Sequence, residues 1–99
     1  MNNHRTVFLT GGARGIGAAI RQELVTAGYA VISPSREELD LASKDSVEAY
    51  LKKHSDLAAD VLINNAGMNI PEKISKISWD TWSKTLQTNL TSAVRLIQF

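Results

Sequence analysis

Several common features are absent from this sequence, and each absence excludes a class of protein. There is no cysteine, which excludes disulfides and thiolate metal sites and is compatible with the cytoplasm. Its apolar runs fall well short of the about 20 residues that span a membrane, and a formal net charge of +1 gives no support for a nucleic-acid or membrane-surface partner. The two histidines, His4 and His54, lack the neighbours of a metal site. We therefore expect residues 1–99 to form a single cytoplasmic domain that binds no metal, nucleic acid or membrane.

Four of the six glycines fall within one short stretch, Gly11–Gly17. The stretch follows the apolar run Val7–Leu9 and opens into a segment with helical spacing. Gly11 can take backbone angles closed to other residues, Gly15 leaves room for a pyrophosphate, and Gly17 lets the helix pack close to the strand. The helix N-terminus offers N–H groups to phosphates. This stretch therefore predicts a dinucleotide-binding turn, the alternative being a tight connection without a ligand.

Hydrophobic periodicity divides the chain into alternating strands and helices. Apolar runs predict strands at 6–10, 29–32 and 60–64, and a very short strand near 39–41. Helical spacing predicts helices at 16–27, from a Ser43 cap to about 54, and from about 79 to the end. Repeated β-α-β units imply parallel strands joined by right-handed crossovers. We therefore expect an α/β fold, the N-terminal half of a Rossmann-like doubly wound sheet with strand order 3-2-1-4.

A second motif follows the last expected strand. The apolar run Val61–Ile63 leads into Asn64–Gly67, which reads NNAG. Together with the TGxxxGxG spacing of Thr10–Gly17, this motif resembles the short-chain dehydrogenase/reductase family. The resemblance covers the whole chain, but the chain covers less than half of a typical member. It implies that residues 1–99 are the incomplete N-terminal, NAD(P)-binding part of an oxidoreductase that transfers a hydride between nicotinamide and a carbonyl or alcohol substrate.

The end of the second expected strand bears on the choice of cofactor. NAD-binding turns place an acidic residue there, whereas this chain has Ser35 followed by Arg36. A guanidinium offers a planar fork of donors to a 2′-phosphate, and Arg14 in the glycine-rich turn could lie near the same phosphate. In the family a basic residue at either position is typical of NADP preference, so the resemblance favours NADP over NAD. Glu37 and Glu38 keep NAD open, because a shifted loop would present a carboxylate to a ribose 2′-OH.

The resemblance also assigns the adenine contacts. Asp40 would accept a hydrogen bond from the adenine amino group, and Leu41 would line the adenine pocket. The alternative is that Asp40 caps the next helix. Thr10 and Ile16 belong to the glycine-rich turn and are counted with its cofactor-binding residues.

Two further sites follow from the resemblance. Asn65, Ala66 and Gly67 would border the cofactor ribose, and the side chains of Asn64 and Asn65 would also tie neighbouring strands together. Ligands bind beyond this end of an open α/β sheet, although an ordinary strand-to-turn connection is the alternative. Asn89 resembles the family's catalytic asparagine, which holds a water that links the active-site lysine to solvent as a proton relay. The alternative for Asn89 is a structural amide with satisfied hydrogen bonds.

The last expected helix carries one apolar stripe. Its members step by three and four residues: Trp79, Trp82, Leu86, Leu90, Ala93 and Ile97. We interpret the two tryptophans as core or subunit interface. Family members are commonly dimers or tetramers, so the resemblance implies a homo-oligomer with this helix at the interface.

The remaining catalytic groups of the family cannot be identified in this sequence. The chemistry needs a serine and a Tyr-xxx-Lys pair, in which the lysine lowers the pKa of the tyrosine, but Tyr50 and Lys53 are three residues apart, on an earlier helix. We therefore expect the chain to be either a piece of a larger protein or a truncated gene product, to leave a sheet edge and apolar surface uncovered, and to be inactive alone. The alternative is a non-catalytic nucleotide-binding or interaction fragment.

Overall fold

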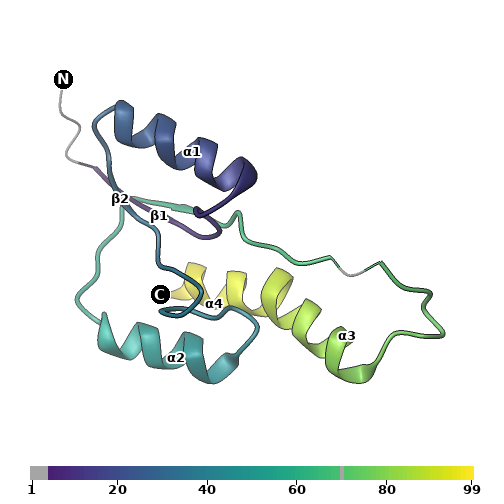
Figure 1. Ribbon diagram of the computed structural model, residues 1–99. Helices are drawn as coiled ribbons and strands as arrows, with labels where there is room; N and C mark the ends of the chain where they lie inside the picture. Colours follow the sequence, from purple (N-terminus) through teal and green to yellow (C-terminus); the bar gives the residue numbers. More distant parts are fainter. Residues whose placement is uncertain (1–4, 70) are drawn as a thin grey trace.

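A computed structural model describes residues 5–69 and 71–99, whose arrangement is shown in Figure 1. His4 lies outside these residues. The elements are β1 (Thr6–Leu9), α1 (Gly15–Thr26), β2 (Ala30–Ile32), α2 (Lys44–Lys53), β3 (Val61–Ile63), α3 (Trp79–Leu86), the π-helical turn η1 (Gln87–Thr91) and α4 (Ser92–Gln98). Over the described ranges, no helix combines the length and the apolar character needed to cross a membrane.

The three strands form one parallel sheet in the order β2-β1-β3. In the central strand β1, Val7 is in register with Val31 of β2 and with Val61 of β3. Helix α1 lies on one face of the sheet, and α2 and α4 lie on the other (Figure 1). Coverage of both faces is the arrangement of a doubly wound α/β fold. The predicted fold class is therefore confirmed. The strand predicted as the fourth in the chain is β3, so the observed order β2-β1-β3 corresponds to the 2-1-4 part of the predicted order 3-2-1-4.

The short strand predicted near residues 39–41 is wrong. Between β2 and β3 the described chain contains only α2 and irregular segments. The Leu39 N–H donates to the Ser35 carbonyl oxygen (2.9 Å), and the Asp40 N–H donates to Ser46 Oγ (2.9 Å). Leu39 itself is only 5% exposed. Burial of its side chain anchors this segment to the core, while its N–H groups bond locally and do not extend the sheet.

One apolar core lies between the sheet, α2 and α4. Phe8 meets the ring of Tyr50 edge-on, with ring centroids 6.0 Å apart, and Leu51 and Leu96 pack in the same cluster. Burial raises the pKa of the Tyr50 phenol. Tyr50 is therefore a protonated core residue across the neutral pH range.

Serine caps begin two of the helices. The Ser43 side chain accepts a hydrogen bond from the Ser46 N–H (3.2 Å) at the start of α2, which confirms the predicted cap. The Ser78 side chain accepts a hydrogen bond from the Thr81 N–H (3.1 Å) at the start of α3. Helix α1 differs, because its N-cap residue, Arg14, makes no side-chain capping bond.

The last helical segment begins at Trp79 as predicted, but its apolar stripe faces outward. Trp79 is 79% exposed and Ile97 is 69% exposed, so the core interpretation of Trp79 is wrong. The buried residues of α4 are Ser92 and Leu96. The π-helical turn also divides α3 from α4, a widening of the helix that periodicity did not indicate.

Polar contacts explain why this helix turns its apolar stripe away from the core. The fully buried Ser92 hydroxyl donates to the Leu41 carbonyl oxygen (2.6 Å) and accepts from Gln87 Nε2 (2.9 Å). At the surface, Arg95 forms a two-bond ion pair with Glu48 of α2, and its shorter bond is 2.7 Å. These bonds fix the rotation of α4 about its axis and fasten it to the segment that follows β2.

Candidate dinucleotide-binding site

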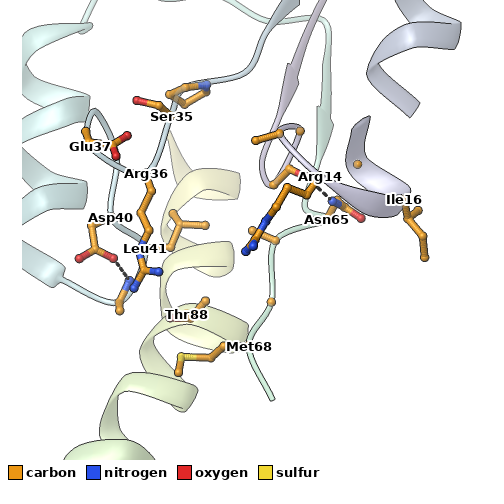
Figure 2. A pocket seen from close by; sticks show the side chains of 18 residues that line it. Arg14, Ile16, Ser35, Arg36, Glu37, Asp40, Leu41, Asn65, Met68 and Thr88 are labelled. Atoms are coloured by element: carbon orange, nitrogen blue, oxygen red, sulfur yellow. Dashed lines mark hydrogen bonds between the residues drawn. The ribbon is translucent and has the colours of Figure 1, made fainter. Parts of the chain in front are cut away.

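A cavity of ≈ 700 Å³ lies beyond the carboxyl ends of the strands (Figure 2). Its volume is in the range of small-molecule and cofactor sites. Eleven of the thirteen residues predicted to bind a cofactor line it: Gly11, Arg14, Ile16, Gly17, Ser35, Arg36, Asp40, Leu41, Asn65, Ala66 and Gly67. Thr10 and Gly15 do not. The fold thus brings predicted residues from three separate segments around one space.

The glycine-rich turn is shaped by a close approach of backbone to backbone. A Cβ on Gly17 would lie 1.8 Å from the Gly11 carbonyl oxygen, so α1 packs directly against the turn. Gly11 itself has a φ of +68°, a conformation that favours glycine. Gly15 also has a positive φ of +55°, but nothing lies within 4 Å of the position its Cβ would take. Gly15 is therefore explained by backbone conformation, and the space beside it is open.

The N-terminus of α1 opens onto the cavity. No acidic residue lies in its first turn, and Arg14 at the N-cap supplies no side-chain acceptor for its N–H groups. The positive end of the helix dipole is therefore left for another acceptor. Figure 2 shows the Arg14 side chain extending into the cavity beside this helix end, with exposed Ile16 at its rim. Such a terminus with a neighbouring guanidinium is suited to an anion.

Asn65 and Thr10 bind the ends of β1 and β3 together. Asn65 Nδ2 donates to the carbonyl oxygens of Thr10 (3.2 Å) and Gly11 (3.1 Å). Thr10 Oγ1 accepts from the N–H groups of Asn65 (3.1 Å) and Ala66 (3.0 Å). The prediction that the asparagine side chains tie neighbouring strands is confirmed for Asn65, whereas Asn64 Nδ2 donates to the Ala93 carbonyl oxygen of α4 (3.4 Å). Thr10 is 3% exposed and is not among the residues that line the cavity, and its hydroxyl holds the segment after β3.

The turn after β2 presents two opposite charges to the cavity, Arg36 and Glu37. Glu38 faces elsewhere, because the Ser35 N–H donates to Glu38 Oε1 (3.0 Å) and the Glu38 N–H donates to Ser35 Oγ (3.3 Å). These reciprocal bonds form a capping box. Hydrogen bonding to Ser35 lowers the pKa of Glu38, and the backbone of Ser35 contributes more than its side chain. Of the two carboxylates that could meet a ribose 2′-OH, Glu37 is therefore the one in the cavity wall.

Asp40 and Leu41 form the next part of the wall, as predicted for an adenine pocket. Asp40 Oδ1 accepts a hydrogen bond from the Ala42 N–H at 3.0 Å. The alternative that Asp40 caps α2 is wrong, since Ser43 occupies the N-cap. The local bond orients the Asp40 carboxylate and engages one of its oxygens.

Asn89 lies in the π-helical turn and binds the segment after β3. Its Oδ1 accepts from the Met68 N–H (2.8 Å), and its Nδ2 donates to the Met68 carbonyl oxygen (2.8 Å). These two bonds fit the alternative interpretation of Asn89, in which its amide has a structural role. The amide of an asparagine has two donors and two acceptor positions, so one of each remains for a water or a ligand.

Met68 and Thr88 are among the lining residues that the sequence analysis did not predict for the site. Thr88 Oγ1 is buried and has no hydrogen-bond partner among the described residues. Their only sequence signal is adjacency, because Met68 follows NNAG and Thr88 precedes Asn89. Across residues 5–69 and 71–99, no three histidine, aspartate or glutamate side chains gather as a metal site.

Comparison with known proteins places this geometry among related folds. The chain superposes on 4-hydroxyisoleucine dehydrogenase complexed with NADH with a TM-score of 0.87 and 19% identity, covering 96% of this chain and 47% of that protein. A short-chain dehydrogenase from Sphingobium yanoikuyae in complex with NADPH gives a TM-score of 0.85 and 21% identity, with 95% and 46% covered. At these identities the superpositions establish the fold.

Sequence relatives extend the comparison. The 3-oxoacyl-[acyl-carrier-protein] reductase FabG of Buchnera aphidicola subsp. Acyrthosiphon pisum is 33% identical over 119 residues, with 97% of this chain and 48% of the relative covered. Acetoacetyl-CoA reductase of Shinella zoogloeoides is 37% identical over 106 residues, with 88% and 44% covered. The chain spans about half the length of these relatives. Because the first alignment is longer than the 99 residues of this chain, FabG has residues there that this chain lacks.

The family comparison is the most direct. Residues 37–99 match the family model for short chain dehydrogenase, and this range includes NNAG and Asn89. The glycine-rich turn lies before the matched range, so it is an independent feature that agrees with the match. The chain belongs to the short-chain dehydrogenase family.

Proposed function

We propose that this chain is the cofactor-binding part of an NAD(P)-dependent oxidoreductase that acts on a small carbonyl or alcohol substrate. The observation that carries the proposal is the cavity itself, where the uncapped N-terminus of α1 meets the turns after β2 and β3. Family membership supports the same function. A nicotinamide cofactor, when bound, supplies the hydride chemistry, and the protein supplies binding and orientation.

Each wall of the cavity has a part in this proposal. The N–H groups at the start of α1 would hold the pyrophosphate, with Gly11 and Gly17 keeping the backbone bare beneath it. Asp40 and Leu41 would bind the adenine. The backbone of 65–67 would border a ribose at the carboxyl end of β3. These positions follow the order of a dinucleotide laid across the switch point of a doubly wound sheet.

We assign the cofactor as NADP in preference to NAD. Arg14 and Arg36 extend into the cavity from opposite walls (Figure 2), and Ser35 adds a hydroxyl beside Arg36. A 2′-phosphate between them would gain charge-assisted hydrogen bonds. Glu37 acts against this preference, because its carboxylate lines the same wall and would repel a phosphate while accepting from a 2′-OH. Arg14 and Arg36 together outweigh the Glu37 carboxylate, and Asp40, the other carboxylate of the wall, is assigned to the adenine.

Asn89 enters the proposal as the catalytic asparagine. Its bonds to the Met68 backbone orient the amide, and the remaining donor and acceptor positions would hold the water of a proton relay. The relay needs the Tyr-xxx-Lys pair, and Tyr50 cannot substitute because it is 7% exposed within the core. We also propose that the protein forms a homo-oligomer through the exposed apolar stripe of α3 and α4. We propose further that it acts in the cytoplasm.

A second candidate function is nucleotide binding without turnover. This candidate would retain the cofactor site without catalysing hydride transfer, and the buried Tyr50 offers no substitute for the catalytic tyrosine of the family. Both functions require the same cofactor site, so one binding experiment tests the part that they share. Turnover assays with the longer protein would then separate them.

The test is calorimetric titration of the chain with NADP and with NAD, after circular dichroism has shown that it is folded. Wild type should bind NADP more tightly. Arg36→Asp should weaken NADP binding by about tenfold or more and shift the preference to NAD, because it removes a charge-assisted contact and adds a carboxylate. Arg21→Ala, on the exposed side of α1, is the control and should leave both affinities unchanged. A folded chain that binds neither cofactor would contradict the proposal.

A further inference from the structure

The turn after β2 contains a capping box in a segment of only four residues. Ser35 accepts the Glu38 N–H with its side chain, and Glu38 accepts the Ser35 N–H with its carboxylate (3.3 and 3.0 Å). The Ser35 carbonyl oxygen accepts the N–H groups of Glu38 (3.1 Å) and Leu39 (2.9 Å). Such a box normally begins a helix, but here the chain leaves the turn at once and buries Leu39 in the core.

The two residues enclosed by this box carry the opposite charges of the cavity wall. Arg36 and Glu37 both line the cavity, and Glu38 does not. Figure 2 shows Arg36 extending down into the cavity while Glu37 lies beside the turn. Rotation of the backbone between Ser35 and Leu39 would change which of the two charges faces a ligand. The box fixes that rotation at one end, and burial of Leu39 fixes it at the other.

We infer that Glu38 is a positioning residue that sets the cofactor preference of the site by holding Arg36, and not Glu37, toward the 2′ position of the adenine ribose. This inference rests on the proposed function. Glu38 acts through the turn and makes no contact with the ligand. Without its cap the turn would sample other conformations, in which Glu37 competes for a 2′-OH. Loss of the cap should therefore weaken NADP binding and spare or strengthen NAD binding.

A different role for Glu38 makes a different prediction. If its negative charge acted directly on the cofactor, it would repel a 2′-phosphate, and neutralising it would strengthen NADP binding. If the cap matters, an uncharged side chain that can still accept the Ser35 N–H should preserve the preference. Glutamine retains such an acceptor oxygen, whereas alanine does not, so these two substitutions separate charge from hydrogen bonding.

The experiment measures the ratio of the dissociation constants for NADP and NAD in four proteins, with circular dichroism as a check on folding. Glu38→Ala should raise the dissociation constant for NADP by roughly three- to tenfold, the range expected for loss of a cap, with no rise for NAD. Glu38→Gln should keep the wild-type ratio. Glu23→Ala, an exposed glutamate on α1 outside the cavity wall, is the matched control.

Each outcome decides between these readings. If Glu38→Ala weakens the binding of NADP and of NAD equally, Glu38 has a merely structural role and the inference is overturned. The inference is also overturned if Glu38→Ala changes neither dissociation constant. Glu38→Gln behaving like Glu38→Ala would overturn it as well, because the cap would then not be the cause. Failure of wild type to bind either cofactor would instead contradict the proposed function, so the two failures are distinguishable.

Discussion

Replacing Gly17 by alanine gives a direct test of the glycine-rich turn. The added Cβ would lie 1.8 Å from the Gly11 carbonyl oxygen, where contacts under 3.0 Å essentially never occur. The helix and the turn would have to separate by about 1.2 Å, the difference between these distances. The turn cannot yield freely, because Asn65 Nδ2 bonds the carbonyl oxygens of both Thr10 and Gly11 (3.2 and 3.1 Å).

The expected change in the free energy of unfolding is the sum of destabilising and stabilising contributions. Overpacking of this kind typically costs about 1–3 kcal/mol, and losing the two Asn65 bonds adds about 1 kcal/mol each. The better helix propensity of alanine offsets about 1 kcal/mol. We therefore expect Gly17→Ala to lower the free energy of unfolding by about 2–4 kcal/mol, a large part of the roughly 5–15 kcal/mol available to a small domain.

Gly15→Ala is the matched control, because it adds the same methyl group two residues away. Nothing lies within 4 Å of its Cβ, so only the positive φ of +55° opposes it, at a cost of about 1–2 kcal/mol. Urea unfolding followed by circular dichroism measures both variants, and an unchanged denaturant slope shows that the comparison is of stability. If Gly17→Ala is no less stable than Gly15→Ala, the close packing of α1 on the turn does not constrain this fold, and the argument is refuted.

Three further predictions concern other parts of the molecule. Leu39→Ala should lower the free energy of unfolding by about 2–5 kcal/mol, measured by urea unfolding, whereas Ile74→Ala, at an 81% exposed position, should change it by less than about 0.5 kcal/mol. Thr88→Val should raise the thermal unfolding midpoint, because it removes a buried hydroxyl without a partner among the described residues; a lower midpoint would contradict this. The hydrogen bond from Arg95 lowers the pKa of Glu48, so the ion pair stabilises the fold fully above the ordinary pKa of 4.5, and this contribution is lost as the pH falls from there through the lower pKa of the folded state. The difference in thermal unfolding midpoint between wild type and Glu48→Gln should therefore shrink on acidification.

Much of the fold could be predicted because local signals coincided with tertiary roles. β1 ends at Leu9, two residues before Gly11. Its three apolar residues are all buried, as a continuous apolar run suggests. Ser43 capped α2 as expected, because serine at that position satisfies a free N–H at a helix start. Most candidate site residues also met around one cavity, since parallel strands bring their carboxyl ends to the same edge of the sheet.

The features that sequence reasoning missed depend on contacts between distant segments. Residues 39–41 alternate between apolar and polar, as in a strand. Whether their backbone joins the sheet depends on the length of the connection that follows β2. The outward stripe of α4 reverses the usual rule because Ser92 finds a buried partner in Leu41, 51 residues earlier. Thr10 looked like part of the phosphate-binding turn, yet its hydroxyl bonds to N–H groups after β3. No pattern within one segment encodes such pairings.

The segment 39–43, which includes the residues 39–41 that were predicted to form a strand, also determines how this wall of the cavity opens. The N–H groups of Leu39, Asp40, Ala42 and Ser43 bond to partners no more than six residues away, namely Ser35, Ser46 and Asp40. The wall can therefore exchange its amide hydrogens through local opening, while exchange in β1 requires disruption of the sheet. A dinucleotide held between this wall and α1 would be detected as slower deuterium uptake at 39–43, with little change at 6–9.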